Sequence, residues 1–232
     1  GMTKIISLDL TSQPYFKTLK AFGSGVASVT FAKGAPVNRL ELPSAMRVLS
    51  LEQLPYLTTG GILLENVANL SAMTVLACPN VSNDFGFVYN WVTNKVVSDA
   101  STSLVMDNVV WENIDPSQFL AVLDIKKNGG ILNLKGKVSL PTATVETVEA
   151  IRELFGDTAF LSTSEFFIEI PESLILEGPS RVVNGKNGTF VATPIPVAVS
   201  SPIYSMIVNG EEVNDIAGVA TLDANTGVLS VN

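Results

Sequence analysis

The sequence contains no histidine and only one cysteine. Without histidine, the chain cannot assemble a Ser-His-Asp or Cys-His catalytic group, and it lacks the commonest zinc ligand. A single cysteine, Cys78, cannot form an internal disulfide. Because Cys78 falls at an apolar position of a periodic stretch, we expect a small buried residue and not a reactive thiol.

Charged residues are scarce, and the basic ones are the minority. Only 16% of the residues are charged, with 14 Lys and Arg against 22 Asp and Glu, so the net charge is −8. A nucleic-acid or anionic-membrane partner would need a basic face, so we expect neither. No apolar run approaches the length of about 20 residues that spans a bilayer, so we expect no membrane insertion. No signal peptide is visible, because Asp9 interrupts the first apolar run; a removed export signal remains open.

A short motif recurs where the chain is rich in leucine. Ser44–Leu49 and Ser71–Leu76 both read SAMxVL and begin 27 residues apart, and similar apolar spacings follow at Leu104 and Leu132. Such a period is typical of one supersecondary unit stacked on its like. The pattern predicts that Leu49, Leu76 and Leu104 are buried above one another in adjacent parallel strands.

Residues 37–140 resemble the leucine-rich repeat family on the strength of this spacing. The asparagine of that family's repeat is met only loosely, by Asn80 and Asn108. Residues 134–156 are similar to the closing unit of leucine-rich proteins from gut bacteria (Bacteroidetes) and their phages. The resemblance implies a solenoid with an extended binding surface, preceded by a cap at residues 2–35. A generic mixed domain with strands about 27 residues apart is the alternative.

Two helices are predicted from local signals. One begins at Pro116 after Asp115, and the other extends from Thr142 to Gly156 with Thr144 as its cap. The second carries three glutamates on its outer side, where solvated carboxylates do no catalysis: Glu146, Glu149 and Glu153. Residues 85–97, whose aromatic residues alternate, predict a strand or extended return segment used for packing.

The C-terminal part consists of short β-rich runs separated by turns such as Asn209-Gly210. Residues 172–232 resemble bacterial Ig-like (Big) domains, mainly through Ala220–Val231, which implies a β-sandwich. Two further strands normally follow in that family. We therefore expect the edge near residues 228–232 to pair with another chain or with the N-terminal domain, or the native chain to continue. Asp223 and Asn225 offer fewer oxygens than the about six to eight that calcium takes, so we interpret them as a turn.

Taken together, the sequence predicts an α+β, mostly β protein. A short, irregular leucine-rich-repeat solenoid occupies residues 1–162, and an Ig-like sandwich, incomplete at its end, occupies residues 163–232. The predicted function is non-enzymatic binding or adhesion to a protein or glycan, at the cell surface or after secretion. The alternatives are a structural component of a phage virion and a carbohydrate-active enzyme with two carboxylates. The prediction names no catalytic, cofactor-binding or metal-binding residue.

Overall fold

The computed structural model describes residues 6–94, 100–170, 173–177, 187–189, 191–195, 206–208, 211–213, 215–216, 220–225 and 228–231. The chain divides into two compact units, Gly1–Glu169 and Ile170–Asn232. The sheets of the first unit are parallel, and those of the second are antiparallel.

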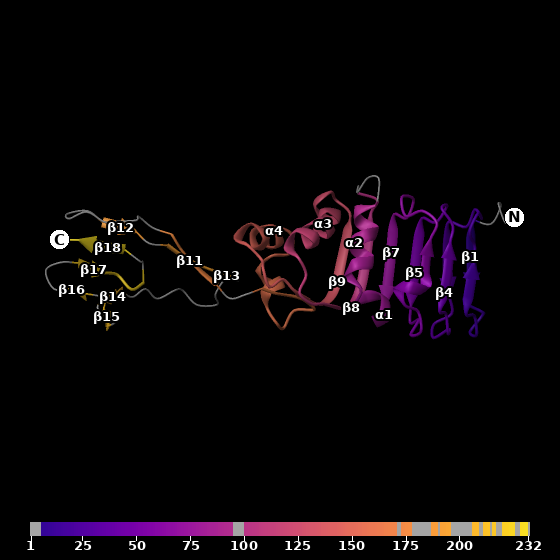
Figure 1. The fold of residues 1–232 in the computed structure, drawn as a ribbon, viewed down its shortest axis with the longest axis horizontal. Helices are drawn as coiled ribbons and strands as arrows, with labels where there is room; N and C mark the ends of the chain where they lie inside the picture. Colours follow the sequence, from indigo (N-terminus) through magenta and orange to yellow (C-terminus); the bar gives the residue numbers. More distant parts are fainter. Residues whose placement is uncertain are drawn as a thin grey trace. The chain divides into compact units, whose positions relative to one another are not determined.

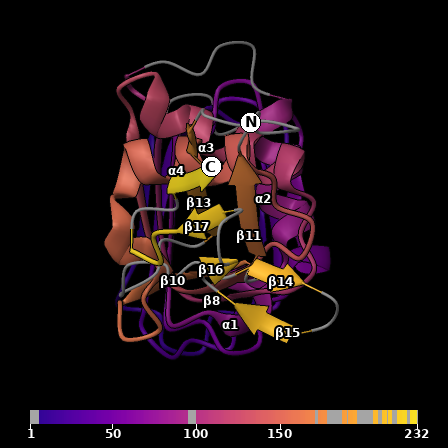
Figure 2. The ribbon, with the colours of Figure 1, turned by 90° about the vertical axis from the view of Figure 1, so that its left-hand side faces the viewer.

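The first unit is built on a seven-stranded parallel sheet, whose strands stand side by side in Figure 1 and behind one another in Figure 2. In sheet order they are β1 (Ser7–Leu10), β3 (Ser28–Phe31), β5 (Val48–Glu52), β7 (Ala72–Leu76), β8 (Ser103–Trp111), β9 (Ile131–Ser139) and β10 (Phe166–Glu169). A smaller parallel sheet contains β2 (Thr18–Lys20), β4 (Arg39–Leu42) and β6 (Ile62–Leu64). Because parallel neighbours need a crossover, the chain alternates between the two sheets from β1 to β7. The segment expected to form the cap supplies β1 to β3.

Helices replace the small sheet as the crossover segments after β7. They are α1 (Pro79–Ser82), α2 (Phe85–Thr93), α3 (Pro116–Lys127) and α4 (Val145–Phe155), with 3-10 turns η1 (Thr59–Gly61) and η2 (Asp157–Phe160). The two predicted helices are confirmed. Asp115 accepts hydrogen bonds from the backbone N–H of Ser117 at 2.8 Å and of Gln118 at 3.4 Å, which fixes the start of α3. Thr144 caps α4, and Gly156 ends it with φ of 73°.

The prediction of a strand or extended return at residues 85–97 is wrong for the described part, which forms α2. The Asp84 side chain accepts a hydrogen bond from the backbone N–H of Phe87 at 3.0 Å and so begins the helix. The buried residues follow helical spacing: Phe85, Val88, Trp91 and Val92. The strict alternation of aromatic residues was therefore coincidental, although Phe85 and Trp91 do pack in the core as expected.

The core lies between the large sheet and its crossover segments. One inward row crosses five neighbouring strands in register: Val29, Leu49, Met73, Leu104 and Leu132. The crossover segments contribute buried side chains of their own: Leu40 and Leu42 of β4, Trp91 of α2, Phe119 of α3 and Ile151 of α4. Each such large apolar side chain contributes about 1.5–3 kcal/mol by burial, so this layer holds the unit together.

The two SAMxVL motifs are not equivalent in the structure. In the first copy Met46 is buried in the turn before β5, whereas in the second copy Met73 is an inward residue of β7. The sheet register places Leu49 beside Met73, and Glu52 beside Leu76. The prediction of a buried stack is therefore right for Leu49 and Leu104 and wrong for Leu76, which is half-buried on the opposite side of the sheet.

The predicted fold class is wrong in both units. The first unit is a mostly parallel α/β sheet and not a leucine-rich-repeat solenoid. The sequence distance between paired positions of neighbouring strands changes along it, from 20 residues for Ser28 and Val48 to 31 for Ala72 and Ser103. The crossover segments also change from strands to helices. A spacing of 27 residues between two hexapeptides could therefore not define a single repeating unit.

The described strands of the second unit form three antiparallel sheets and not an Ig-like sandwich. The pairs are β11 (Ser173–Glu177) with β13 (Val191–Ile195), and β14 (Met206–Val208) with β15 (Glu211–Val213). The third sheet has four strands in the order β12 (Asn187–Thr189), β18 (Val228–Val231), β17 (Ala220–Leu222) and β16 (Asp215–Ile216). Alternation and turn residues predict hairpins, but they do not specify how separate sheets stack.

The strand β18 lies inside its sheet and not at an edge. Ser230 pairs with Asn187 of β12 on one side and with Thr221 of β17 on the other. This arrangement removes the open edge from which pairing near residues 228–232 was expected.

Candidate functional site

One face of the large sheet is open to solvent. Within the described part of the first unit, the helices and the small sheet pack on the opposite face, as the contact of Phe85 in α2 with the inward Trp111 illustrates. On the outward side, the Val48 side chain is 44% exposed and the Ile131 side chain 58%. We define the open face by its outward positions: residues 7, 9, 28, 30, 48, 50, 52, 72, 74, 103, 105, 131 and 133. A parallel sheet is normally covered on both sides, so an open face calls for an explanation.

Short polar side chains line the open face over β1 and β3. The Ser28 hydroxyl donates to the Ser7 oxygen at 3.1 Å. Asp9 accepts hydrogen bonds from the Thr30 hydroxyl at 3.3 Å, and from the Thr11 backbone N–H at 2.9 Å and hydroxyl at 2.7 Å. The Thr11 N–H, followed by these hydroxyls, lowers the pKa of Asp9 below its ordinary value. Asp9 is therefore a charged acceptor at neutral pH, in a row of hydroxyl groups.

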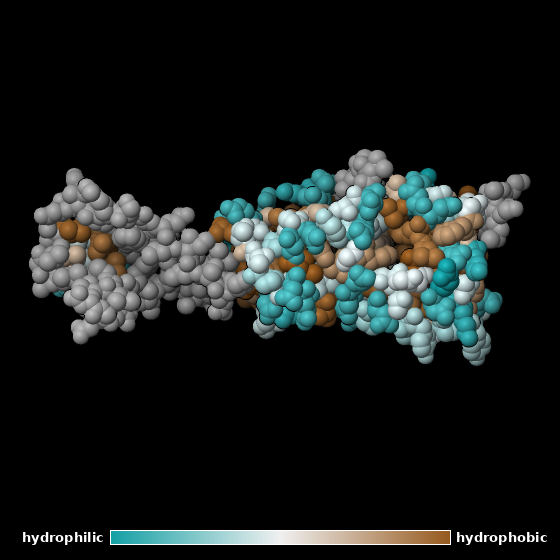
Figure 3. Space-filling view, viewed as in Figure 1, coloured by the Kyte–Doolittle hydropathy of each residue, from teal (hydrophilic) through white to brown (hydrophobic). Residues whose placement is uncertain are grey.

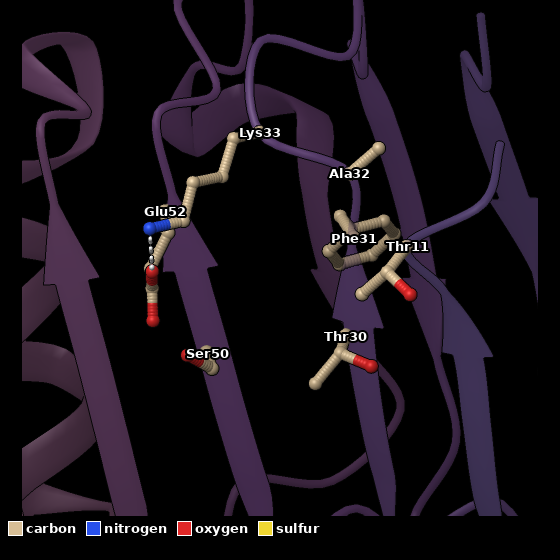
Figure 4. Close-up of a pocket in the computed structure, with 7 residues that line it drawn as sticks. All are labelled: Thr11, Thr30, Phe31, Ala32, Lys33, Ser50 and Glu52. Carbon is tan, nitrogen blue, oxygen red and sulfur yellow. Dashed lines mark ion pairs between the residues drawn. The ribbon is translucent and has the colours of Figure 1, made fainter. Parts of the chain in front are cut away.

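A hollow of about 350 Å³ lies where β1, β3 and β5 end. We call it the β1–β5 hollow; its lining residues are Thr11, Thr30, Phe31, Ala32, Lys33, Ser50 and Glu52. Figure 4 shows Ser50 and Glu52 on one side, Thr30 and Thr11 on the other, and Lys33 reaching across to Glu52. The Lys33 Nζ lies 3.3 Å from the Glu52 Oε2, and these side chains are 63% and 39% exposed. The pair is therefore held loosely and remains accessible to a ligand.

The opposite end of the sheet has a different surface. Lys135 pairs with Glu165 at 2.8 Å, and Lys137 pairs with Glu169 at 2.9 Å. The hydrogen bond to Glu165 raises the pKa of Lys135, and the same contact lowers the pKa of Glu165. On the side of the unit shown in Figure 3, hydrophobic and hydrophilic residues are interspersed. The β1–β5 hollow thus differs from its surroundings by combining hydroxyl groups with one accessible charge pair.

The residues weighed in the sequence lie away from the hollow. Cys78 is buried, as predicted, and burial raises the pKa of its thiol. The three outer glutamates of α4 are exposed, as predicted: Glu146, Glu149 and Glu153. The Asn225 backbone N–H donates to Asp223 Oδ1 at 2.9 Å, which confirms the interpretation of a turn.

The residues that line the hollow were not predicted as a site from the sequence. A signal was available, because Thr30 and Ser50 alternate with buried apolar neighbours, and Asp9 alternates with half-buried leucines, which indicates the solvent side of a strand. Alternation along one strand does not indicate how that strand is paired in register with its neighbours. Only the register brings these residues together from separate turns of the chain.

Comparison with known protein families, with curated proteins and with solved structures finds no match for this chain. The resemblances to leucine-rich and Big proteins therefore stay predictions from sequence. Within the described ranges, no helix is long and apolar enough to cross a membrane, and no three or more His, Cys, Asp or Glu residues gather as a metal site.

Proposed function

We propose that this chain is a non-enzymatic binding protein, exposed at a cell surface or secreted, whose open face engages a protein or glycan. The observation that carries the proposal is the open face itself. A parallel sheet presents flat, regularly spaced side chains, and leaving it uncovered costs a layer of packing that most such sheets have. Hydroxyl side chains such as Thr30, Ser50 and Thr74 make part of this face polar, so it is suited to remain exposed until a ligand covers it.

The side-chain pattern supports recognition by several weak contacts. Thr30, Ser50 and Thr74 lie on the neighbouring strands β3, β5 and β7, which are spaced by about 4.8 Å in a sheet. A ligand that lies across the strands would meet one hydroxyl group at each step. Each hydroxyl oxygen can accept, and those whose hydrogen is not already bonded within the protein can also donate, so such a row can pair with an extended polar ligand without a deep cavity.

The test is to block the open face with a bulky group. Thr74→Cys, modified with a polymer through the new thiol, covers the middle of the face. Glu149→Cys, modified in the same way, places the polymer on the exposed outer side of α4 and serves as the matched control. Both proteins are applied to arrays of defined glycans and of extracellular protein domains.

We expect the Glu149→Cys conjugate to retain the binding of the unmodified chain and the Thr74→Cys conjugate to lose it. Equal binding by both conjugates would place the interaction elsewhere and overturn the proposal. Failure of the unmodified chain to recognise any array member would overturn it as well.

A further inference from the structure

The β1–β5 hollow has the size of a ligand site but not the lining of a protein interface. Its volume of about 350 Å³ falls in the range of about 300–1,000 Å³ found for small-ligand pockets. Protein interfaces depend on aromatic and arginine anchors in apolar pockets. The single aromatic residue that lines the hollow, Phe31, is buried, and the accessible groups are hydroxyls, an ammonium and a carboxylate.

The arrangement of these groups is complementary to a polyhydroxylated ring. Thr30 and Ser50 lie on neighbouring strands. The Ser50 hydroxyl can donate and accept, whereas the Thr30 hydroxyl donates to Asp9 and offers its oxygen as an acceptor. Lys33 Nζ and Glu52 Oε2, 3.3 Å apart, offer a donor and an acceptor side by side. Two adjacent sugar hydroxyls can use both: one accepts from the ammonium while its neighbour donates to the carboxylate.

The charge around the hollow selects against acidic ligands. Lys33 and Glu52 cancel one another, and Asp9, bonded to the lining residues Thr11 and Thr30, adds a negative charge. The whole chain has a net charge of −8, which repels polyanions at a distance. Sulfated and uronic-acid polymers are therefore disfavoured relative to neutral ones.

We propose that the β1–β5 hollow binds one unit of a neutral polysaccharide through Thr30, Ser50 and the Lys33–Glu52 pair. This rests on the proposed function, because it makes the ligand of the open face a glycan. The remaining sugar units of the chain extend across the open face toward Thr74 of β7.

The experiment is electrophoresis of the full chain through gels that contain one soluble polysaccharide each. The neutral panel comprises an α-glucan, a β-glucan, a mannan and a galactan; the anionic panel comprises polygalacturonate and dextran sulfate. The variants are Glu52→Gln, Thr30→Val and Ser50→Ala. Because the Lys33–Glu52 pair is largely exposed, its loss should leave the fold intact, which a thermal melt verifies. The matched control is Glu169→Gln, which disrupts the Lys137–Glu169 pair at the other end of the sheet.

We expect at least one neutral polysaccharide to retard the wild-type chain and the Glu169→Gln variant equally. Each hollow variant should weaken the binding at least about tenfold, since each loses one polar contact whose partner is left unpaired. Binding to neutral polysaccharide that all three hollow variants retain would overturn the inference while leaving the open-face proposal standing. Retardation by the anionic panel alone, or by no polysaccharide, would overturn it too; the array experiment with Thr74→Cys then decides the proposed function separately.

Discussion

The backbone N–H of Leu54 donates a hydrogen bond to the Cys78 Sγ at 3.2 Å, which joins two turns of the chain that are 24 residues apart. The thiol in turn donates to the Leu76 carbonyl at 3.3 Å. Burial is the main cause that raises the pKa of Cys78 above its ordinary value of 9.0. The thiol is therefore a structural group that connects the segments after β5 and β7.

This environment predicts that Cys78 is inert in the folded protein. The thiolate is the reactive form, and both burial and the raised pKa keep its population low. A thiol reagent should label the native chain only at the rate at which it unfolds, and label it fully in denaturant. Thr74→Cys, on the open face, should react at once and supplies the positive control. Rapid stoichiometric labelling of the unmodified native chain would contradict the prediction.

The sheet register predicts different losses of stability when two apolar residues of β7, Met73 and Leu76, are truncated. Met73 is fully buried in the inward row, so Met73→Ala should cost about 2–5 kcal/mol of unfolding free energy. Leu76 points outward and is only half-buried, so Leu76→Ala should cost about 1 kcal/mol or less. Denaturant melts of the two variants measure both values. A larger loss for Leu76→Ala than for Met73→Ala would contradict the observed register. It would favour the pairing of Leu76 with Leu49 that the 27-residue spacing of the two hexapeptides predicts.

Alanine substitutions at two glycines with positive φ distinguish the energetic cost of backbone strain from that of a steric clash. Gly136 in β9 has φ of 130°, and an added Cβ would collide with the backbone of Val109 in β8. Gly34 has φ of 75°, but an added Cβ there meets nothing within 4 Å. Gly34→Ala should therefore cost only the conformational penalty of about 1–2 kcal/mol. Gly136→Ala adds a displacement of β8 from β9 and should cost several-fold more. Equal melting temperatures of the two variants would refute this distinction.

Glu65 should make the stability of the first unit depend on pH. It follows β6 and accepts hydrogen bonds from the backbone N–H of Ser44 at 2.8 Å and of Gly23 at 3.4 Å, so it joins the ends of β2, β4 and β6. The Ser44 bond, followed by the Gly23 bond, lowers the pKa of Glu65 below its ordinary value of 4.5. Its stabilising contribution is therefore fully present above about pH 4.5 and is lost as the pH falls through the lower, folded-state pKa.

The measurement is the difference in melting temperature between wild type and Glu65→Gln as a function of pH. We expect wild type to be more stable above pH 4.5 and the difference to shrink below it. Glu153→Gln, at an exposed position of α4, is the control for general loss of negative charge. A difference for Glu65→Gln that stays constant across this range would contradict the assignment.

The elements that could be predicted from the sequence are those with local causes. The helices α3 and α4 were recognised because their end signals lie next to them in the sequence. These signals are Asp115 and Pro116 at the start of α3, Thr144 at the start of α4 and Gly156 at its end. The burial of Leu49, Leu104 and Cys78 was predicted from apolar positions that recur along the chain, and all three are buried.

The errors arose where distant parts of the chain decide the outcome. Leu76 was placed in the core because its hexapeptide copies an earlier one, but hydrogen bonding to β5 sets the register. Residues 85–93 were interpreted as a strand or extended segment from aromatic alternation alone, whereas the Asp84 side chain caps a helix there. The β1–β5 hollow could not be predicted, since Thr30 and Glu52 meet only through the pairing of β3 with β5.

The parallel order of the large sheet also determines how the first unit carries load. β1 and β10 are its two edge strands, and the interstrand hydrogen bonds run roughly along the line between them. A pull applied between these strands therefore stresses one interface at a time, so the strands peel apart in sequence at low force. A pull along any single strand must instead shear all of that strand's bonds together and meets much higher resistance. The direction of tension, more than the total number of bonds, sets the mechanical strength of this unit.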